Sequence, residues 1–77
     1  MEDNPISGKT CIKILCKYFG FKITRQKGSH IILVKYNPEK IGTVVPNHKE
    51  LKQGTLKGIL ELAKVSYLEF YNALKKK

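Results

Sequence analysis

Residues 21–36, FKITRQKGSHIILVKY, predict a β-hairpin around which the rest of the fold can be assembled. The first half, residues 21–26, alternates its side chains with the period of a half-buried strand. Residues 27–29, Lys-Gly-Ser, are typical of a tight turn. Residues 30–36 then return as a second strand, because they contain a run of aliphatic and β-branched side chains.

The alternation assigns the side chains of both strands to faces. In the first strand, Phe21, Ile23 and Arg25 are expected on the inner side, and Arg25 can reach solvent from the end of the strand. The second strand divides into His30, Ile32, Val34 and Tyr36 on one face and Ile31 and Leu33 on the other. A sheet covered by helices on one side does not need apolar residues on both faces. We therefore expect a partner protein, or else the C-terminal helix, to cover Ile31 and Leu33.

The next segment predicts a third, short strand. Residues 37–40, Asn-Pro-Glu-Lys, are a turn signal. Residues 41–46 have the composition of a strand and stop at Pro46, which cannot donate to a central ladder. Three strands with tight connections predict an antiparallel meander.

A helix is predicted before the sheet, over residues 7–19. Its apolar residues have the i, i+3, i+4, i+7 spacing of a buried stripe: Ile12, Leu15, Cys16 and Phe19. Ser7 is a suitable N-cap, and Gly20 suits the position after the helix where φ becomes positive.

Two more helices are predicted after the sheet. Residues 47–54 form a polar loop, and Thr55 is expected to cap the helix that follows. The inner face of that helix consists of Leu56, Ile59, Leu60 and Ala63. Ser66 and Glu69 have the spacing of a capping box, so a short helix should begin there. Its apolar residues are Leu68, Tyr71 and Leu74.

Together these segments predict an α+β fold in the order α-β-β-β-α, with a short extra C-terminal helix. The helices should pack on one face of a three-stranded antiparallel sheet. A chain of 77 residues accommodates one domain, here residues 1–77, and we expect residues 1–6 and 75–77 to be flexible.

The charge balance points to a polyanionic partner. Fifteen Lys and Arg residues against six Asp and Glu residues give a formal net charge of +9. Such a balance favours nucleic acid first, an acidic protein second and a membrane surface third; a merely basic, soluble surface is the alternative. No window of the sequence is apolar enough to span a bilayer. The first residues, MEDNPISG, are acidic and polar and do not resemble a secretory signal, so a cytoplasmic protein is expected.

The cysteines and carboxylates predict neither a disulfide nor a metal site. Cys11 and Cys16 lie five residues apart on the first helix and point in different directions, so they cannot bridge while the helix is intact. We expect both to be reduced and to pack as small hydrophobes. The acidic residues are scattered along the chain, and no His or Cys has ligand spacing, so no metal or other cofactor is expected.

The turn of the hairpin holds the candidate site. His30 follows a cationic turn directly, and an imidazole can transfer protons near neutral pH. Arg25 and Lys27 are the nearest groups for holding a phosphate. Gly28 allows close approach of the backbone, and the amides of Gly28 and Ser29 could donate to a phosphate oxygen. In the structural alternative, His30 is a packed or capping residue, and Gly28 and Ser29 serve only the turn.

Other polar residues are weaker candidates for binding. Lys9, Lys13 and Lys17 recur at i, i+4, i+8 and form a cationic ridge on the first helix. Such a ridge is either a solvated face or a set of phosphate contacts. His48 lies in the loop after Pro46, where a histidine most often completes hydrogen bonds.

Four short motifs occur in order along the chain: Gly-Phe at 20–21, R-Q-K-G-S-H at 25–30, Val-Pro-x-His at 45–48, and G-T-L-x-x-I-L at 54–60. In this order, and in a chain of this length, they resemble the HicA-type toxins of bacterial and archaeal toxin–antitoxin pairs. The chain departs from the family pattern at Ile31-Ile32-Leu33, where polar or aromatic residues are common, and at Lys64-Val65, where a glycine is common.

The resemblance implies a fold similar to the double-stranded RNA-binding domain and activity as an mRNA interferase that cleaves RNA and arrests translation. It also implies a HicB-type antitoxin as protein partner, with DNA contacted only through that antitoxin. The active-site histidine of the family falls on His30. An acidic antitoxin that buries His30 would also serve as the cover expected for Ile31 and Leu33.

Three other functions stay open at this point. A non-catalytic RNA-binding module of the same fold would use the basic residues without a reactive histidine. A helix-turn-helix DNA-binding protein would use the two C-terminal helices, although Tyr67, Glu69 and Tyr71 are not a typical reading face. A toxin that has lost its activity is the third.

Overall fold

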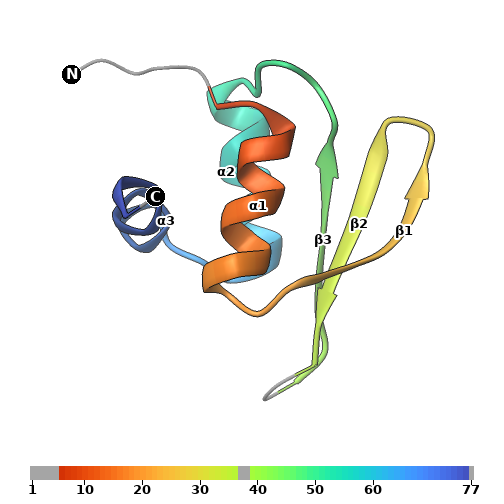
Figure 1. Cartoon of the computed structure of the whole chain (residues 1–77), viewed down its shortest axis with the longest axis horizontal. Helices are drawn as coiled ribbons and strands as arrows, with labels where there is room; N and C mark the ends of the chain where they lie inside the picture. Colours follow the sequence, from red (N-terminus) through yellow and green to blue (C-terminus); the bar gives the residue numbers. More distant parts are fainter. Residues whose placement is uncertain (1–5, 37–38, 77) are drawn as a thin grey trace.

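The computed structural model describes residues 6–36 and 39–76. These residues form three helices and a three-stranded antiparallel sheet: α1 Gly8–Tyr18, β1 Lys22–Lys27, β2 His30–Lys35, β3 Ile41–Pro46, α2 Gln53–Ala63 and α3 Tyr67–Lys75. The strands lie in the order β1-β2-β3, and the helices lie on one side of the sheet (Figure 1). The α+β fold predicted from the sequence is confirmed.

The helices and the sheet form layers. Both α1 and α2 contact β3, whereas α3 contacts α1 on the side away from the sheet (Figure 1). Thr43 of β3 is buried and donates a hydrogen bond from Oγ1 to the carbonyl oxygen of Ile59 in α2 at 2.9 Å. This bond satisfies the only polar side chain that is buried among the described residues, so the core between sheet and helices is otherwise apolar.

The first helix begins and ends as predicted but buries a different face. Ser7 is the N-cap and accepts a hydrogen bond from the Thr10 amide at 3.0 Å, and Gly20 has φ +79° just beyond the helix. The buried side chains of α1 are Cys11, Ile14 and Leu15, whereas Ile12, Cys16 and Phe19 of the predicted stripe are only half-buried. The reason is that α1 has neighbours on two sides, β3 and α3. Its buried surface is therefore wider than that of a helix that packs only against a sheet, and it is centred on different residues.

The prediction that β1 is half-buried is wrong. All six residues of β1 are exposed, and Ile23 is 57% exposed. The hairpin of β1 and β2 extends beyond the helix layer, which contacts β3 at the other edge of the sheet (Figure 1). Phe21, by contrast, lies before the strand and is buried at 2% exposure.

The expectation that a partner protein covers Ile31 and Leu33 is wrong, because these side chains face the helices of the chain itself. Ile31 pairs with Val45 and Leu33 pairs with Thr43, and all four are buried in the core. The helix layer of the chain itself therefore covers them. It is the opposite set on β2, beginning with His30, that lies on the side without helices.

The helices after the sheet follow the predicted pattern with shifts at their ends. α2 begins at Gln53, and Lys52 occupies its N-cap without a side-chain hydrogen bond, so Thr55 is not the cap. The predicted inner face of α2 is confirmed. The helix ends at Ala63, and its C-cap residue Lys64 has φ +60° although it is not a glycine. Lys64 occupies the left-handed position that a glycine would fill without strain.

The capping box of α3 is confirmed by both of its bonds. Ser66 Oγ accepts from the Glu69 amide, and the Glu69 carboxylate accepts from the Ser66 amide, each at 3.1 Å. The buried residues of this helix are Phe70 and Ala73. Leu68 is 72% exposed, contrary to its assignment to the apolar side. Tyr71 and Leu74 pack partly buried against the core.

The cysteines are free, as expected. Cys11 is fully buried, and desolvation by burial raises the pKa of its thiol to about 12. Burial also raises the pKa of Cys16, which is half-buried. Both thiols therefore stay protonated at neutral pH and pack as apolar groups.

Two expectations about turns and ends extend beyond the described residues. A turn is predicted at residues 37–40, and Asn37 and Pro38 lie outside the described residues. Both ends of the chain are expected to be flexible, and residues 1–5 and Lys77 also lie outside them. Within the described part, Ile6 is buried and pairs with Leu51 in an isolated bridge, and Lys75 ends α3.

Gly8 gives a test of how α1 is joined to the sheet. Its amide donates to the carbonyl oxygen of His48 at 2.8 Å, and a Cβ at this position would overlap the carbonyl oxygen of Pro46. We expect Gly8→Ala to lower the free energy of unfolding by about 1–3 kcal/mol. Gly58→Ala in α2, where an added Cβ has no neighbour within 4 Å, is the control and should raise it by about 0.5–1 kcal/mol. Urea unfolding of both variants measures this, and equal stabilities would contradict it.

Candidate functional site

The β1–β2 turn brings the ends of the three strands together. Gly28 has φ +60° at the first central position of a two-residue turn, which is the type II′ pattern that suits a hairpin. The Gln26 amide nitrogen Nε2 donates to the Gly28 carbonyl oxygen at 3.0 Å. The carbonyl oxygen of Ser29 accepts from the Asn47 amide at 2.6 Å, which ties the turn to the residue after β3. The turn is thus held from both sides.

His30 is the first residue of the central strand. It pairs with Lys27 on β1 and with Pro46 on β3, and its side chain is exposed. Ile31, next to it, is buried under the helices, so alternation places the imidazole on the side of the sheet without helices. The structure therefore presents His30 to solvent between a cation and a proline.

A β-bulge moves Arg25 to the same face. Ile23 pairs with Leu33, but the next pair is Arg25 with Ile32, so Thr24 is the extra residue. Its hydroxyl donates to the Ile32 carbonyl oxygen at 3.2 Å. Since paired residues share a face, Arg25 lies with Ile32 and not with Ile23. The prediction that Arg25 shares the inner side with Ile23 is wrong, and the bulge is the reason.

We call the side of the sheet without helices the His30 face. It comprises Lys22, Arg25 and Lys27 of β1, His30, Ile32 and Val34 of β2, and Gly42, Val44 and Pro46 of β3. Cations follow one edge of this face, apolar side chains occupy its middle, and His30 lies at one end. Lys22 is a member that the sequence did not suggest, because only the register of β1 against β2 assigns it to this face.

The lysines of α1 lie elsewhere. Lys13 and Lys17 line a pocket of about 350 Å³ between α1 and the end of α3, together with Lys76. Lys9 is exposed in the first turn of α1, whose start lies beside the end of β3. The structure therefore separates Lys13 and Lys17 from the His30 face, whereas Lys9 lies at the end of α1 that is beside the end of β3.

His48 lies near this end of the sheet, in the loop after β3. Its amide donates to the Pro46 carbonyl oxygen at 2.9 Å, and its carbonyl oxygen accepts from Gly8. The backbone of His48 therefore joins β3 to α1, and its side chain is exposed.

The described residues contain neither a cluster of metal ligands nor a membrane-spanning helix. No group of three or more His, Cys, Asp or Glu residues lies close enough together to hold a metal ion in this part of the chain. Among the helices described, none is sufficiently long and apolar to cross a membrane.

Comparison with known families identifies the chain. Residues 8–65 match the family model of the HicA toxin of bacterial toxin–antitoxin systems. The chain belongs to the HicA toxin family. The matched region begins at the first residue of α1 and ends just after α2, so it contains the whole sheet and the β1–β2 turn. No curated protein matches the chain in a sequence search.

Membership in the HicA toxin family assigns a role and a kind of partner. The protein is the toxin of a toxin–antitoxin system, and an antitoxin is its partner. The family resemblance inferred from the four motifs is thereby confirmed.

Proposed function

We propose that this HicA toxin is an endoribonuclease, an mRNA interferase that cleaves RNA and arrests translation in the cytoplasm. The observation that carries the proposal is the position of His30 on an exposed face beside Lys27 and close to Arg25. A proton-transfer group next to two phosphate-binding cations is what RNA cleavage requires. The family match supports it, because the β1–β2 turn lies within the matched region.

RNA supplies its own nucleophile, which is why one histidine can suffice. His30 takes the proton of the 2′-hydroxyl, and the 2′-oxygen then forms a bond to the adjacent phosphorus. The bond from phosphorus to the 5′-oxygen breaks, and that oxygen leaves as a hydroxyl after accepting a proton from the imidazolium or from water. The products are a 2′,3′-cyclic phosphate and a 5′-hydroxyl. General acid–base catalysis of this kind contributes ~10²–10⁴ in rate.

The groups around His30 hold the phosphate. Lys27 is its pairing neighbour, and Arg25 lies on the same face two pairs further along. Both can neutralise the charge that increases on the phosphate in the transition state. Gly28 leaves open space above the turn, since an added Cβ would have no neighbour within 4 Å, so a phosphate oxygen can approach the amides of Gly28 and Ser29. Lys9 and Lys13 add contacts to more distant phosphates.

We propose further that the antitoxin is of the HicB type, is acidic and covers the His30 face. Val44 is 38% exposed in the middle of this face, beside Ile32, so apolar surface is available for a partner. The net charge of +9 favours an acidic partner. Binding there would bury His30 and exclude RNA, and DNA would be contacted only through the antitoxin.

Replacing His30 tests catalysis. We expect His30→Ala to reduce cleavage of a long unstructured RNA by ~10² or more, because the proton-transfer group is lost. Most of the RNA affinity should remain, since the phosphate contacts are unchanged. The melting temperature should also stay close to that of the wild type, because the side chain is exposed. His48→Ala is the matched control and should keep most of the activity.

Two results would contradict this assignment. A well-folded His30→Ala variant that cuts at the wild-type rate would remove His30 from catalysis and make His48 the next candidate. A wild-type protein that binds RNA without cutting it would instead indicate a non-catalytic RNA-binding module.

Paired charge removal tests the phosphate contacts. One double variant combines Arg25→Gln with Lys27→Gln, and the other combines Lys9→Gln with Lys13→Gln. Each removes two positive charges, and the two variants do so on separate surfaces. Each pair should weaken RNA binding and make the log–log dependence of affinity on salt shallower by roughly one unit per lost phosphate contact. Only the Arg25/Lys27 pair should also lower kcat at saturating RNA. Equal loss of kcat in both variants would refute this division of roles.

Chelation tests the need for a metal. We expect cleavage to continue undiminished in EDTA, because in the mechanism above the charge on the phosphate is neutralised by Arg25 and Lys27 and the nucleophile comes from RNA. Rates are compared with and without EDTA, with a magnesium-dependent nuclease as control. Activity that disappears with EDTA and returns with magnesium would contradict the mechanism.

A further inference from the structure

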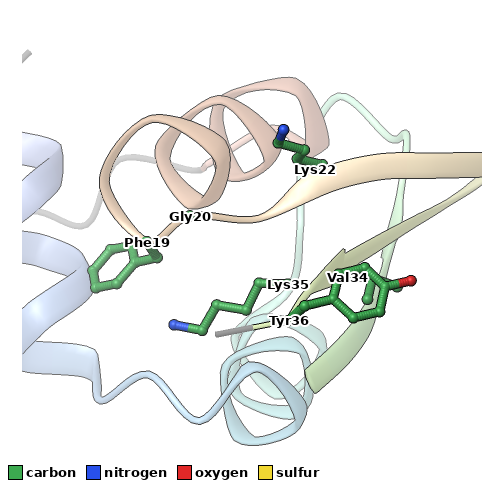
Figure 2. A pocket seen from close by; sticks show the side chains of 6 residues that line it. All are labelled: Phe19, Gly20, Lys22, Val34, Lys35 and Tyr36. Atoms are coloured by element: carbon green, nitrogen blue, oxygen red, sulfur yellow. The ribbon is translucent and has the colours of Figure 1, made fainter. Parts of the chain in front are cut away.

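A pocket lies at the opposite end of β2 from His30. It measures about 460 Å³ and is lined by residues from the end of α1, the start of β1 and the end of β2: Phe19, Gly20, Lys22, Val34, Lys35 and Tyr36 (Figure 2). Lys22 and Val34 pair on the His30 face, so part of the lining of the pocket lies on the same side of the sheet as His30. Within the described part of the chain, no carboxylate lines it. We call it the Tyr36 pocket.

Tyr36 presents an exposed aromatic ring in this pocket. Its side chain is 67% exposed, whereas the other three tyrosines of the chain are half-buried. Among the described residues it makes no hydrogen bond and no aromatic contact. Figure 2 shows the Tyr36 hydroxyl directed away from Lys35, and Val34 lines the same pocket. An exposed aromatic ring is a suitable platform for stacking a nucleobase.

Two lysines supply positive charge around this platform. Lys35 is held in place, because its ammonium nitrogen lies 5.2 Å from the centroid of the buried Phe21 ring. Lys22 extends from the neighbouring strand, away from Lys35 (Figure 2). Gly20, with φ +79°, adds no side chain between them. An aromatic platform with cations in the same pocket is the combination that binds single-stranded nucleic acid.

We propose that the Tyr36 pocket binds one unpaired nucleotide of the RNA substrate. The base stacks on the Tyr36 ring next to Val34, and Lys22 and Lys35 neutralise the flanking phosphates. This inference rests on the proposed ribonuclease function and adds a subsite to it. His30 and Tyr36 are six residues apart on one continuous extended segment, or about 20 Å. The stacked nucleotide therefore lies several nucleotides from the bond that is cut.

Binding to RNA tests the pocket without any cleavage. Tyr36→Ala, Tyr36→Leu and Tyr36→Phe are each made in the His30→Ala background, and their affinities for a labelled unstructured RNA are measured. We expect the Ala and Leu variants to bind about 5-fold to more than 100-fold more weakly, because both lose the stacking surface. The Phe variant keeps the ring and should bind within about twofold of the parent. Leu68→Ala, at a 72% exposed position on α3, is the control and should change nothing.

Cleavage by proteins with His30 intact gives the second measurement. Tyr36→Ala should raise KM and leave kcat at saturating RNA close to the wild-type value, since Tyr36 lies far from the reacting atoms. RNAs that lack a single base are then compared at each position around the cut. Removing the one base that stacks on Tyr36, several nucleotides from the cut, should raise the KM of the wild type as Tyr36→Ala does. The same removal should not raise the KM of the Tyr36→Ala variant any further.

The outcomes separate this inference from the proposed function. If the wild type cuts no RNA, the ribonuclease proposal fails, yet the binding series still decides whether Tyr36 stacks a base. The pocket assignment is overturned if Tyr36→Ala and Tyr36→Leu bind RNA like their parent, or if Tyr36→Phe loses as much as Tyr36→Ala. It is also overturned if Tyr36→Ala weakens binding of the antitoxin and leaves RNA binding unchanged, which would make the pocket a protein-docking surface.

Discussion

Burial of Ile31 and Leu33 under the helices determines which side chains of the sheet face solvent. Each of these side chains, fully removed from water, stabilises the fold by about 1.5–3 kcal/mol. Because side chains alternate along a strand, burying this pair fixes His30, Ile32 and Val34 on the opposite face. A slip of one residue would expose the apolar pair and turn His30 into the core. The position of the candidate catalyst is therefore set by packing on the other side of the sheet.

Much of this arrangement could be predicted from local sequence, because local interactions determine it. The Lys27-Gly28-Ser29 turn and the capping box at Ser66 and Glu69 depend on neighbours within a few residues. The inner face of α2 follows from its period alone, since that helix packs against the sheet. His30 became a candidate from its place directly after the turn, which is a local signal, and from the family resemblance, which extends over residues 20–60.

The errors concern features that depend on distant residues. The bulge at Thr24, which places Arg25 on the His30 face, exists only as a mismatch between two paired strands. The exposure of β1 depends on how far the helices extend across the sheet, and the buried arc of α1 depends on α3. In each case tertiary packing overrides the local preference.

Most of the positive charge of the chain has no acidic partner among the described residues. The described residues contain a single ion pair, Lys64 with Glu39 at 3.1 Å, and both side chains are more than half exposed. Such a pair contributes about 0–1 kcal/mol and leaves most of the net charge of +9 uncompensated. Self-repulsion of this charge destabilises the folded state, so it is a cost that the sheet and its core must offset. The cost is reduced whenever a polyanion or an acidic antitoxin occupies the basic surface.

The strand that carries His30 also fixes the geometry of the proposed RNA path. β2 is paired on both sides, with β1 and with β3, so neither of its ends can move alone. Tyr36 directly follows the last residue of this strand, and His30 is the first. A catalytic group and a stacking ring joined by one paired strand keep a constant separation, which flexible loops would not provide. An RNA that engages both would be cut at a constant number of nucleotides from the stacked base. Selectivity in this small toxin would then come from a distance built into the sheet, with no need for hydrogen-bond readout beside the scissile phosphate.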